Sequence, residues 1–319
     1  MSLTTERLAF KPFEYPWAFD LWKKQQQVHW MPEEVPLADD LIDWESRLTP
    51  SERNLLTQIF RFFTQSDIEV NNCYHKHYLR IFKPTEVVMM LTAFSNMETI
   101  HVAAYSYLLE TIGMPATEYE AFLKYAAMKD KFDFMRSFDP ENPVEVAETM
   151  ATFGGFTEGL QLFASFAMLL NFPRFNKMKG MGQIVTWSVR DETIHCDGIT
   201  RMYHTYCAEN GLVGNAQLTQ RALANCEHIV KSEDVFIDLA FEAGPIEGMT
   251  PHDVKQYIRY IADIRLNQLH LPELYGIKKN PLPWLSTMLN GVEHANFFEA
   301  RSTEYSRAAT TGDWDDGFN

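Results

Sequence analysis

Apolar residues recur at helical spacing along most of this chain. The segment "TPSE" at 49–52 has the pattern of a capping box with proline at the first helical position. Behind it, one side of the predicted helix reads Leu55, Ile59, Phe62, Phe63, Ser66 and Val70. Similar start and stop signals predict further helices over 83–113, from 117, and over 143–172, 180–210, 216–243, 251–270 and 283–305. Alternating β-branched runs with hairpin turns are absent, so we predict an all-α fold, a bundle of long helices with extra helices around it.

The most apolar stretch runs from Thr149 to Phe172 and contains a single charged residue, Glu158. Its length suits a membrane span, but Glu158 lies near its middle, Gln161 follows, and the first half is rich in glycine. These features favour a helix buried inside a soluble bundle.

Composition narrows the class of protein. The 319 residues are 46% hydrophobic and 13% aromatic, which is typical of a globular chain with a large core. A net charge of −15 argues against binding to nucleic acid. The first residues lack the pattern of a signal peptide, and the four cysteines form no CxxC pair, so we expect a cytoplasmic protein with reduced thiols.

The tetrapeptide "ETIH" occurs twice, at Glu98–His101 and at Glu192–His195. Residues at i and i+3 share one face of a helix, so each copy directs a carboxylate and an imidazole to the same side. A single Glu-x-x-His is a weak motif, because about one chance match is expected in a chain of this length. Here the only two matches are identical, and each falls in a helix predicted from other signals.

Two other predicted helices each contain an acid within an apolar face or run. Asp67 continues the apolar side of the helix that begins at 50, whereas Glu69, about 200° away around that helix, falls on the other side. The second acid is Glu158. Burying an unpaired carboxylate costs several kcal/mol, so such groups are normally paired or bound to a metal.

Together the four helices offer four carboxylates and two imidazoles. This donor set is typical of a di-iron or di-manganese carboxylate site inside a four-helix bundle. The alternative, six unrelated polar residues, is disfavoured because all four helices would have to coincide. The predicted ligands are Asp67, Glu98, His101, Glu158, Glu192 and His195.

With these motifs, nearly the whole chain resembles the small, radical-generating subunit of class I ribonucleotide reductase. The resemblance implies a ferritin-like four-helix bundle core with surrounding helices. It implies that Asp67, Glu98 and His101 hold one metal, that the other three ligands hold a second, and that Glu98 and Glu192 bridge them. The metals would be iron or manganese, as a di-iron, di-manganese or mixed pair.

The resemblance also implies residues for radical chemistry. Tyr105, in "HVAAY", would store the oxidising equivalent, unless the metals keep it, and Leu162 and Phe166 would line a pocket around it. The segment "HWMPEEV" resembles the family's tryptophan segment. The transfer path to the partner subunit would use Trp30, Asp191, Glu34 and Tyr305.

Domain and partner expectations follow from the same resemblance. Residues 1–304 would form one helical dimetal domain, and the acidic, aromatic tail 305–319 would be a flexible peptide that docks on the large subunit. A frayed terminus is the other interpretation of this tail. We also expect a homodimer and a flavodoxin-like activator, with neither nucleic acid nor membrane as partner.

The implied activity is that of a ribonucleoside-diphosphate reductase subunit, active only with the large subunit that reduces ribonucleotides to deoxyribonucleotides. The chain has neither GxxxxGK[ST] nor GxGxxG, consistent with a nucleotide site on the partner. The alternative is a ferritin-like dimetal oxidase or monooxygenase that binds its own ligand. Such an enzyme would share the six ligands but would need neither the relay of Trp30 and Asp191 nor a docking tail. Iron storage or a helical interaction module is disfavoured by the chain length and by Tyr105.

Overall fold

The computed structural model describes residues 2–118 and 139–289. The chain divides into two units, Met1–Pro281 and Leu282–Asn319, and all regular structure among the described residues of both is helical. The predicted all-α, ferritin-like fold is therefore confirmed. The predicted helix from 117, most of the one over 283–305 and the whole tail lie outside the described residues.

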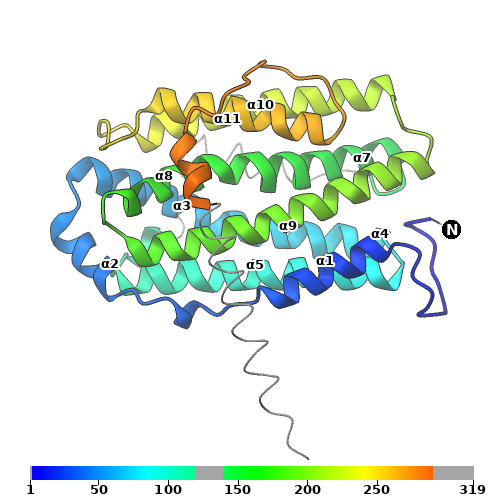
Figure 1. Ribbon diagram of the computed structural model, residues 1–319, viewed down its shortest axis with the longest axis horizontal. Helices are drawn as coiled ribbons and strands as arrows, with labels where there is room; N and C mark the ends of the chain where they lie inside the picture. Colours follow the sequence, from blue (N-terminus) through cyan, green and yellow to red (C-terminus); the bar gives the residue numbers. More distant parts are fainter. Residues whose placement is uncertain (1, 119–138, 290–319) are drawn as a thin grey trace, which may run out of the picture. The chain divides into compact units, whose positions relative to one another are not determined.

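The core of the first unit is a bundle of four long helical segments (Figure 1). Neighbouring segments pack against one another, and the site ligands predicted above all come from them. The segments are α3 (Pro50–Cys73), α5 (Thr85–Thr111), a composite of α7 (Pro143–Met150), a π-helical stretch (Ala151–Gln161) and α8 (Leu162–Arg174), and α9 (Lys179–Glu209).

Further helices surround this bundle. α1 (Pro16–Gln27), which the sequence analysis did not assign, packs on α5 and α9. α10 (Ala216–Ala240) and α11 (Pro251–Gln268) pack together and against the composite segment, and each ends within about three residues of its predicted boundary.

Local sequence sets where the bundle helices begin. At α3 the predicted capping box is present: Thr49 Oγ1 accepts a hydrogen bond from the Glu52 amide, and Glu52 Oε2 accepts one from the Thr49 amide. At α9 the carboxylate of Asp40 accepts hydrogen bonds of 2.8 Å from the amides of Gly180 and Met181. This buried contact fixes the end of the helix that carries the second ETIH.

The composite segment is buried, as predicted for the apolar run around Glu158. Both the composite segment and α5 are long and apolar enough to cross a membrane. The most apolar window of the composite segment, however, is entirely buried inside the bundle, as in the core helix of a soluble protein. Gly154 permits close packing on α9, because a Cβ atom there would lie 2.4 Å from Ile199 Cβ.

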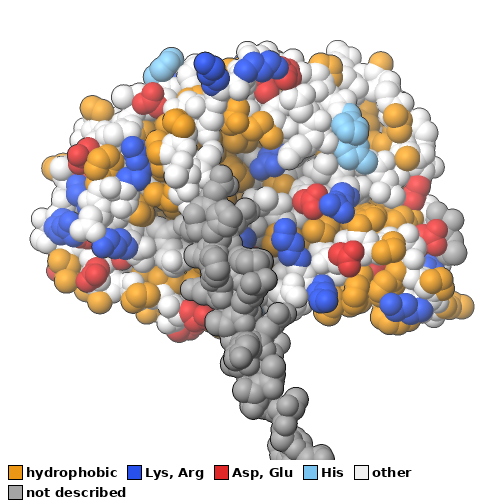
Figure 2. Space-filling model, viewed as in Figure 1, with side chains coloured by type: hydrophobic (Ala, Val, Ile, Leu, Met, Phe, Trp, Pro, Cys, Tyr) orange, Lys and Arg blue, Asp and Glu red, His pale blue; other side chains and the backbone are white. Residues whose placement is uncertain are grey.

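The surface differs from this interior. On the face shown in Figure 2, lysine and arginine side chains are interspersed with aspartate, glutamate and apolar ones. The predicted ligands are hidden beneath such a surface, since each is at most 2% exposed.

Candidate metal centre

The four core segments bring the predicted ligands into the interior of the bundle. Asp67 comes from α3, Glu98 and His101 come from α5, and Glu158 comes from the π-helical stretch. Glu192 and His195 come from α9. The i, i+3 spacing of each ETIH therefore does what the sequence predicts and directs both side chains of a pair to the same side.

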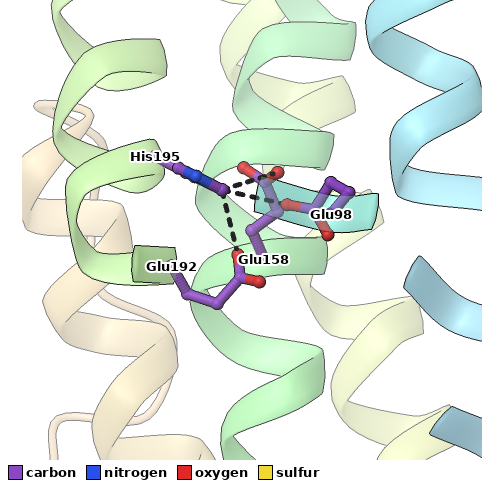
Figure 3. Close-up of side chains that lie close together, drawn as sticks. All are labelled: Glu98, Glu158, Glu192 and His195. Atoms are coloured by element: carbon purple, nitrogen blue, oxygen red, sulfur yellow. Dashed lines mark ion pairs between the residues drawn. The ribbon is translucent and has the colours of Figure 1, made fainter. Parts of the chain in front are cut away.

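Glu98, Glu158, Glu192 and His195 form a compact cluster (Figure 3). Each offers one ligand atom, and these atoms all lie within 4.8 Å of one another. The Nδ1 atom of His195 lies 3.1 Å from Oε1 of Glu98, 3.5 Å from Oε2 of Glu192 and 3.8 Å from Oε1 of Glu158. Three carboxylates from three segments thus face one imidazole nitrogen.

His101 faces the same carboxylates from the other side. Its Nδ1 atom lies 3.3 Å from Oε1 of Glu192 and 3.6 Å from Oε2 of Glu98. The carboxylates of Glu98 and Glu192 are therefore close to both histidines, whose ring centroids are 6.5 Å apart. This is where bridging ligands would lie.

Asp67 is buried, whereas Glu69, the rejected candidate on the same helix, is only half-buried. Burial and then the negative charge of Glu98 raise the pKa of Asp67 well above its ordinary value, with smaller contributions from Glu192 and Glu158. The acid that the apolar pattern selected is thus the one that shares its surroundings with the cluster.

The electrostatics of the two histidines also depend on the cluster. Burial by itself lowers the pKa of each imidazole, but the neighbouring carboxylates outweigh it and raise both pKa values well above the ordinary range. Asp191 contributes most at His101, and Glu158 contributes most at His195. In the protein without metal, the protonated imidazoles of His101 and His195 therefore supply the positive charge that faces these carboxylates.

Unpaired polar atoms show that the site fits a metal pair. A buried polar atom without a partner is costly, so a group of them needs an explanation. Oxygen and imidazole nitrogen donors suit iron and manganese. Among the described residues, the site atoms without a hydrogen-bond partner are Asp67 Oδ2, both Glu98 oxygens, Glu158 Oε2, Glu192 Oε2 and both ring nitrogens of His195.

Tyr105 is buried on α5, one turn beyond His101. Its hydroxyl lies 3.4 Å from Oγ of Ser188. Its ring packs against that of Phe63 with centroids 4.8 Å apart, and Phe63 packs against Phe166 with centroids 5.5 Å apart. Leu162 is buried as well. Burial and the charge of Asp67 raise the pKa of Tyr105, so the phenol is protonated at neutral pH.

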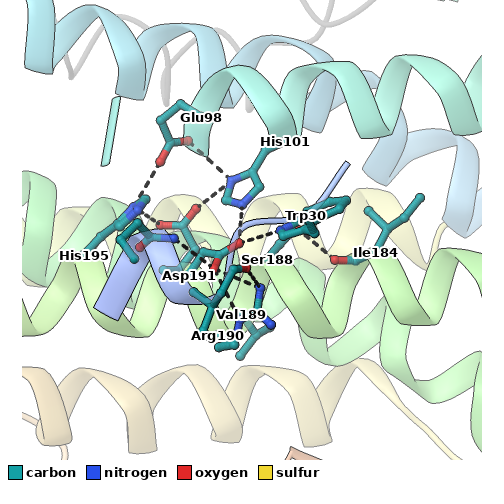
Figure 4. Close-up of polar contacts among 12 residues, drawn as sticks. Trp30, Glu98, His101, Ile184, Ser188, Val189, Arg190, Asp191 and His195 are labelled. Carbon is teal, nitrogen blue, oxygen red and sulfur yellow. Dashed lines mark hydrogen bonds and ion pairs between the residues drawn. The ribbon is translucent and has the colours of Figure 1, made fainter. Parts of the chain in front are cut away.

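Trp30 and Asp191 extend the site away from the metals (Figure 4). The indole Nε1 of Trp30 donates a hydrogen bond to Oδ2 of Asp191 at 2.8 Å, and the same oxygen lies 3.3 Å from Nε2 of His101. Gln25 and Arg190 donate to the other oxygen of Asp191. Burial raises the pKa of Asp191, but the hydrogen bond and charge of His101 lower it overall, so this residue stays a carboxylate.

The remaining path residues stand apart from this contact. Glu34 is exposed, and its carboxylate accepts a hydrogen bond from the Met31 amide in a short turn. Tyr305 lies outside the described residues. A second tryptophan that the sequence analysis did not single out, Trp187, packs against Trp30 at 5.1 Å.

Sequence reasoning also missed three polar neighbours of the site: Gln25, Tyr74 and Ser188. Tyr74 donates a hydrogen bond of 2.7 Å to Oε1 of Glu158. The sequence did contain a signal for Tyr74. It follows Asp67 by seven residues, or two helical turns, just as Tyr105 follows Glu98. Gln25 and Ser188 had no comparable signal, since single polar residues in helices are common.

Known proteins match the chain along its length. The family model "Ribonucleotide reductase, small chain" matches residues 7–281. A protein of Invertebrate iridescent virus 6, named "Probable ribonucleoside-diphosphate reductase small subunit", is 42% identical over 100% of this chain and 99% of its own. The ribonucleoside-diphosphate reductase subunit beta of Chlamydia pneumoniae is 30% identical over 93% of this chain and 89% of its own.

Solved structures share the fold. The ribonucleotide reductase R2 subunit of Clostridium botulinum superposes with a TM-score of 0.81 at 23% identity, covering 91% of this chain and 94% of that one. The dimanganese(II)-NrdF of Streptococcus sanguinis gives a TM-score of 0.74 at 18% identity, covering 85% and 94%.

Proposed function

This chain belongs to the ribonucleotide reductase small-chain family, and we propose that it generates the oxidising equivalent on which its large subunit depends. The large subunit then reduces ribonucleotides to deoxyribonucleotides. The observation that carries this proposal is the contact of Trp30 with Asp191 and of Asp191 with His101, which joins a buried carboxylate–histidine cluster to a tryptophan outside it. A dimetal oxidase with its own substrate would need an outer partner for His101 but no tryptophan beyond it.

Two metal ions would be held by the six predicted ligands. Asp67, Glu98 and His101 would serve one ion, the remaining three would serve the other, and Glu98 with Glu192 would bridge. When bound, the metal pair supplies the one-electron oxidising power that side chains alone do not have. The donor types suit both iron and manganese, so the pair would be matched or mixed.

Tyr105 would store the oxidising equivalent. Its surroundings support this role in two ways. Phe63 packs on the Tyr105 ring and Phe166 packs on Phe63; with the buried Leu162 they would exclude water from a group that must survive between turnovers. Among the described residues, its hydroxyl makes a hydrogen bond only to Ser188, and that contact is long at 3.4 Å, so it holds the phenolic proton weakly.

Asp191 would couple His101 to Trp30. One carboxylate oxygen faces both the indole N–H and the imidazole Nε2, so this oxygen can hold or release a proton as charge moves between the two rings. Gln25 and Arg190 fix the other oxygen, which keeps the carboxylate from rotating. Glu34 and Tyr305 would continue the path toward the large subunit.

Assembly and location complete the proposal. The tail 305–319 would dock on the large subunit through its aromatic and acidic residues, and two copies of the chain would form the active homodimer. A flavodoxin-like protein would act as activator, and the complex would work in the cytoplasm.

The test combines the chain with a large subunit from the same source and assays reduction of ribonucleoside di- and triphosphates, with metal content measured on the same sample. We expect turnover only when both subunits and about two metal ions per chain are present. A folded, metal-loaded protein that supports no reduction with its large subunit would refute the reductase function.

A further inference from the structure

Tyr74 is a buried tyrosine in contact with the metal site, and the proposed function gives it no role. It opens the π-helical stretch Tyr74–Tyr78 that continues α3, and its side chain is 2% exposed. Its ring meets those of His195 and Phe94 edge-on, with centroids 6.3 Å away in both cases. The ring of Tyr78 also meets it edge-on at a centroid distance of 6.0 Å, so three rings hold Tyr74 in place, one of them that of a predicted ligand.

The hydroxyl of Tyr74 makes one strong contact. It donates a hydrogen bond of 2.7 Å to Oε1 of Glu158, while Oε2 of Glu158 has no partner among the described residues. Burial, followed by the negative charges of Glu158 and Glu98, raises the pKa of Tyr74 well above its ordinary value. The hydroxyl is the donor in this contact, and the carboxylate oxygen is the acceptor.

Both partners lie in wide helical turns. Tyr74 belongs to one π-helical stretch and Glu158 to another, Ala151–Gln161, and such stretches often occur at functional sites. An α-helix continued without change would aim these side chains differently, so the contact depends on the local backbone of both segments.

Each half of the predicted metal site thus has one buried polar partner behind a ligand. Asp191 supports His101 in the first half, and Tyr74 supports Glu158 in the second. His195 receives no such support, because its Nε2 has no hydrogen-bond partner among the described residues. In the second half, Tyr74 is thus the outer partner found among the described residues.

We propose that Tyr74 is a positioning residue that sets the affinity of the second metal subsite, formed by Glu158, Glu192 and His195. By occupying Oε1 it commits Oε2 of Glu158 to the cation and prevents the carboxylate from turning. This inference rests on the two-metal site of the proposed function. It predicts that the metal affinities of the two subsites depend on different outer residues. Asp191 affects the first subsite, and Tyr74 affects the second.

The experiment is a titration of metal-free protein with Mn(II), in which electron paramagnetic resonance of the free ion measures how much is bound. Wild-type protein is compared with Tyr74→Phe, which removes one oxygen and keeps the ring. We expect Tyr74→Phe to bind one Mn(II) with unchanged affinity and the second about 10–100-fold more weakly, the usual cost of losing an outer partner of a ligand.

Tyr78→Phe is the matched control. Tyr78 is buried one turn further along the same stretch and packs against Phe82. We expect it to bind both ions as wild type does. An equal loss in Tyr78→Phe and Tyr74→Phe would overturn the proposal, as would unchanged binding or an equal loss at both subsites in Tyr74→Phe.

A rescue variant separates the hydrogen bond from general packing. With 4-aminophenylalanine at position 74, the ring keeps an N–H donor in place of the hydroxyl, so binding of the second ion should return toward the wild-type value. Failure of this rescue, in protein with the wild-type circular dichroism spectrum, would refute the hydrogen-bond role even if Tyr74→Phe cannot be purified. Wild-type protein that binds fewer than two Mn(II) ions would instead refute the dimetal site itself, and this inference with it.

Discussion

The indole nitrogen of Trp30 and the imidazole Nε2 of His101 meet at the same oxygen of Asp191, at 2.8 Å and 3.3 Å. Asp191→Ala removes this shared acceptor and leaves two buried donors without a partner. We expect the affinity of the first metal to fall about 10–100-fold and nucleotide reduction to be lost. Asp197→Ala, at an exposed acid on the same helix that pairs with Arg201, should change neither quantity. Full reduction by Asp191→Ala would exclude the relay.

Tyr105→Phe tests where the oxidising equivalent is stored. The hydroxyl makes only a long contact, so its loss should change the free energy of unfolding by no more than about 1 kcal/mol and leave metal binding intact. We expect the tyrosyl doublet in the low-temperature electron paramagnetic resonance spectrum and nucleotide reduction both to disappear. Tyr107→Phe, at a half-buried tyrosine on another side of α5, should behave as wild type. A metal-centred signal without a doublet in wild-type protein would assign the storage to the metals.

Asp67 and Glu69 form a matched pair of acids on α3. Asp67→Asn should weaken the first metal site by more than about tenfold, because it removes a ligand. It should also stabilise the metal-free protein, because the amide is neutral without having to bind a proton, whereas the raised pKa of Asp67 beside Glu98 costs stability. Glu69→Gln should leave Mn(II) binding unchanged. Isothermal titration and urea unfolding measure the two effects, and a loss of binding in Glu69→Gln alone would reverse the assignment.

The metal-free protein should lose stability as the pH rises above about 6.5. The folded-state pKa values of His101, His195, Asp67 and Glu158 are all raised, so the folded protein binds more protons than the unfolded chain over this range. The slope of unfolding free energy against pH is then negative. The pKa of Asp191 is lowered, but its opposite contribution falls in acid, below about pH 4.

Urea unfolding in the presence of a chelator, at about pH 6.5 and about pH 8.5, checks this sign. Saturating Mn(II) should weaken or reverse the slope, because the ligands bind the metal in their deprotonated forms. A metal-free protein that becomes more stable as pH rises would show that the cluster does not hold extra protons.

Removal of residues 305–319 tests the docking tail. We expect nucleotide reduction with the large subunit to be lost while Mn(II) binding stays at the wild-type level, because the ligands all lie earlier in the chain. A synthetic peptide of the same fifteen residues should compete with the intact chain for the large subunit. A peptide with Trp314→Ala and Phe318→Ala is the control and should compete poorly. An unimpaired truncated chain would favour the oxidase alternative.

The sequence predicted most of this site because its features are local. The i, i+3 spacing inside each ETIH fixes which side chains share a helix face, whatever the rest of the chain does. Asp67 was separable from Glu69 by the apolar positions around it, and Glu158 by its isolation in an apolar run. α1 was missed because it is short and no side chain caps its start.

The contacts that sequence could not predict depend on distant segments. The spacing of Tyr74 from Asp67 indicates their shared helix face, but the hydrogen bond from Tyr74 to Glu158 joins residues 84 positions apart and follows from how distant segments pack. The hydrogen bond from Gln25 to Asp191 joins residues 166 positions apart, so it follows from the packing of α1 on α9. Phe63 was expected as an apolar position, but its place against Tyr105 required the arrangement of α3 and α5.

A single straight element, α9, carries Ser188 beside Tyr105, Asp191 beside Trp30, and the ligands Glu192 and His195. A shift of this helix by one residue's rise, about 1.5 Å, would displace all four groups together. A backbone shift that improved the position of one of these groups would therefore misplace the other three. Divergence within such a scaffold, natural or engineered, is confined to exchanging side chains on the helices that face α9, one at a time.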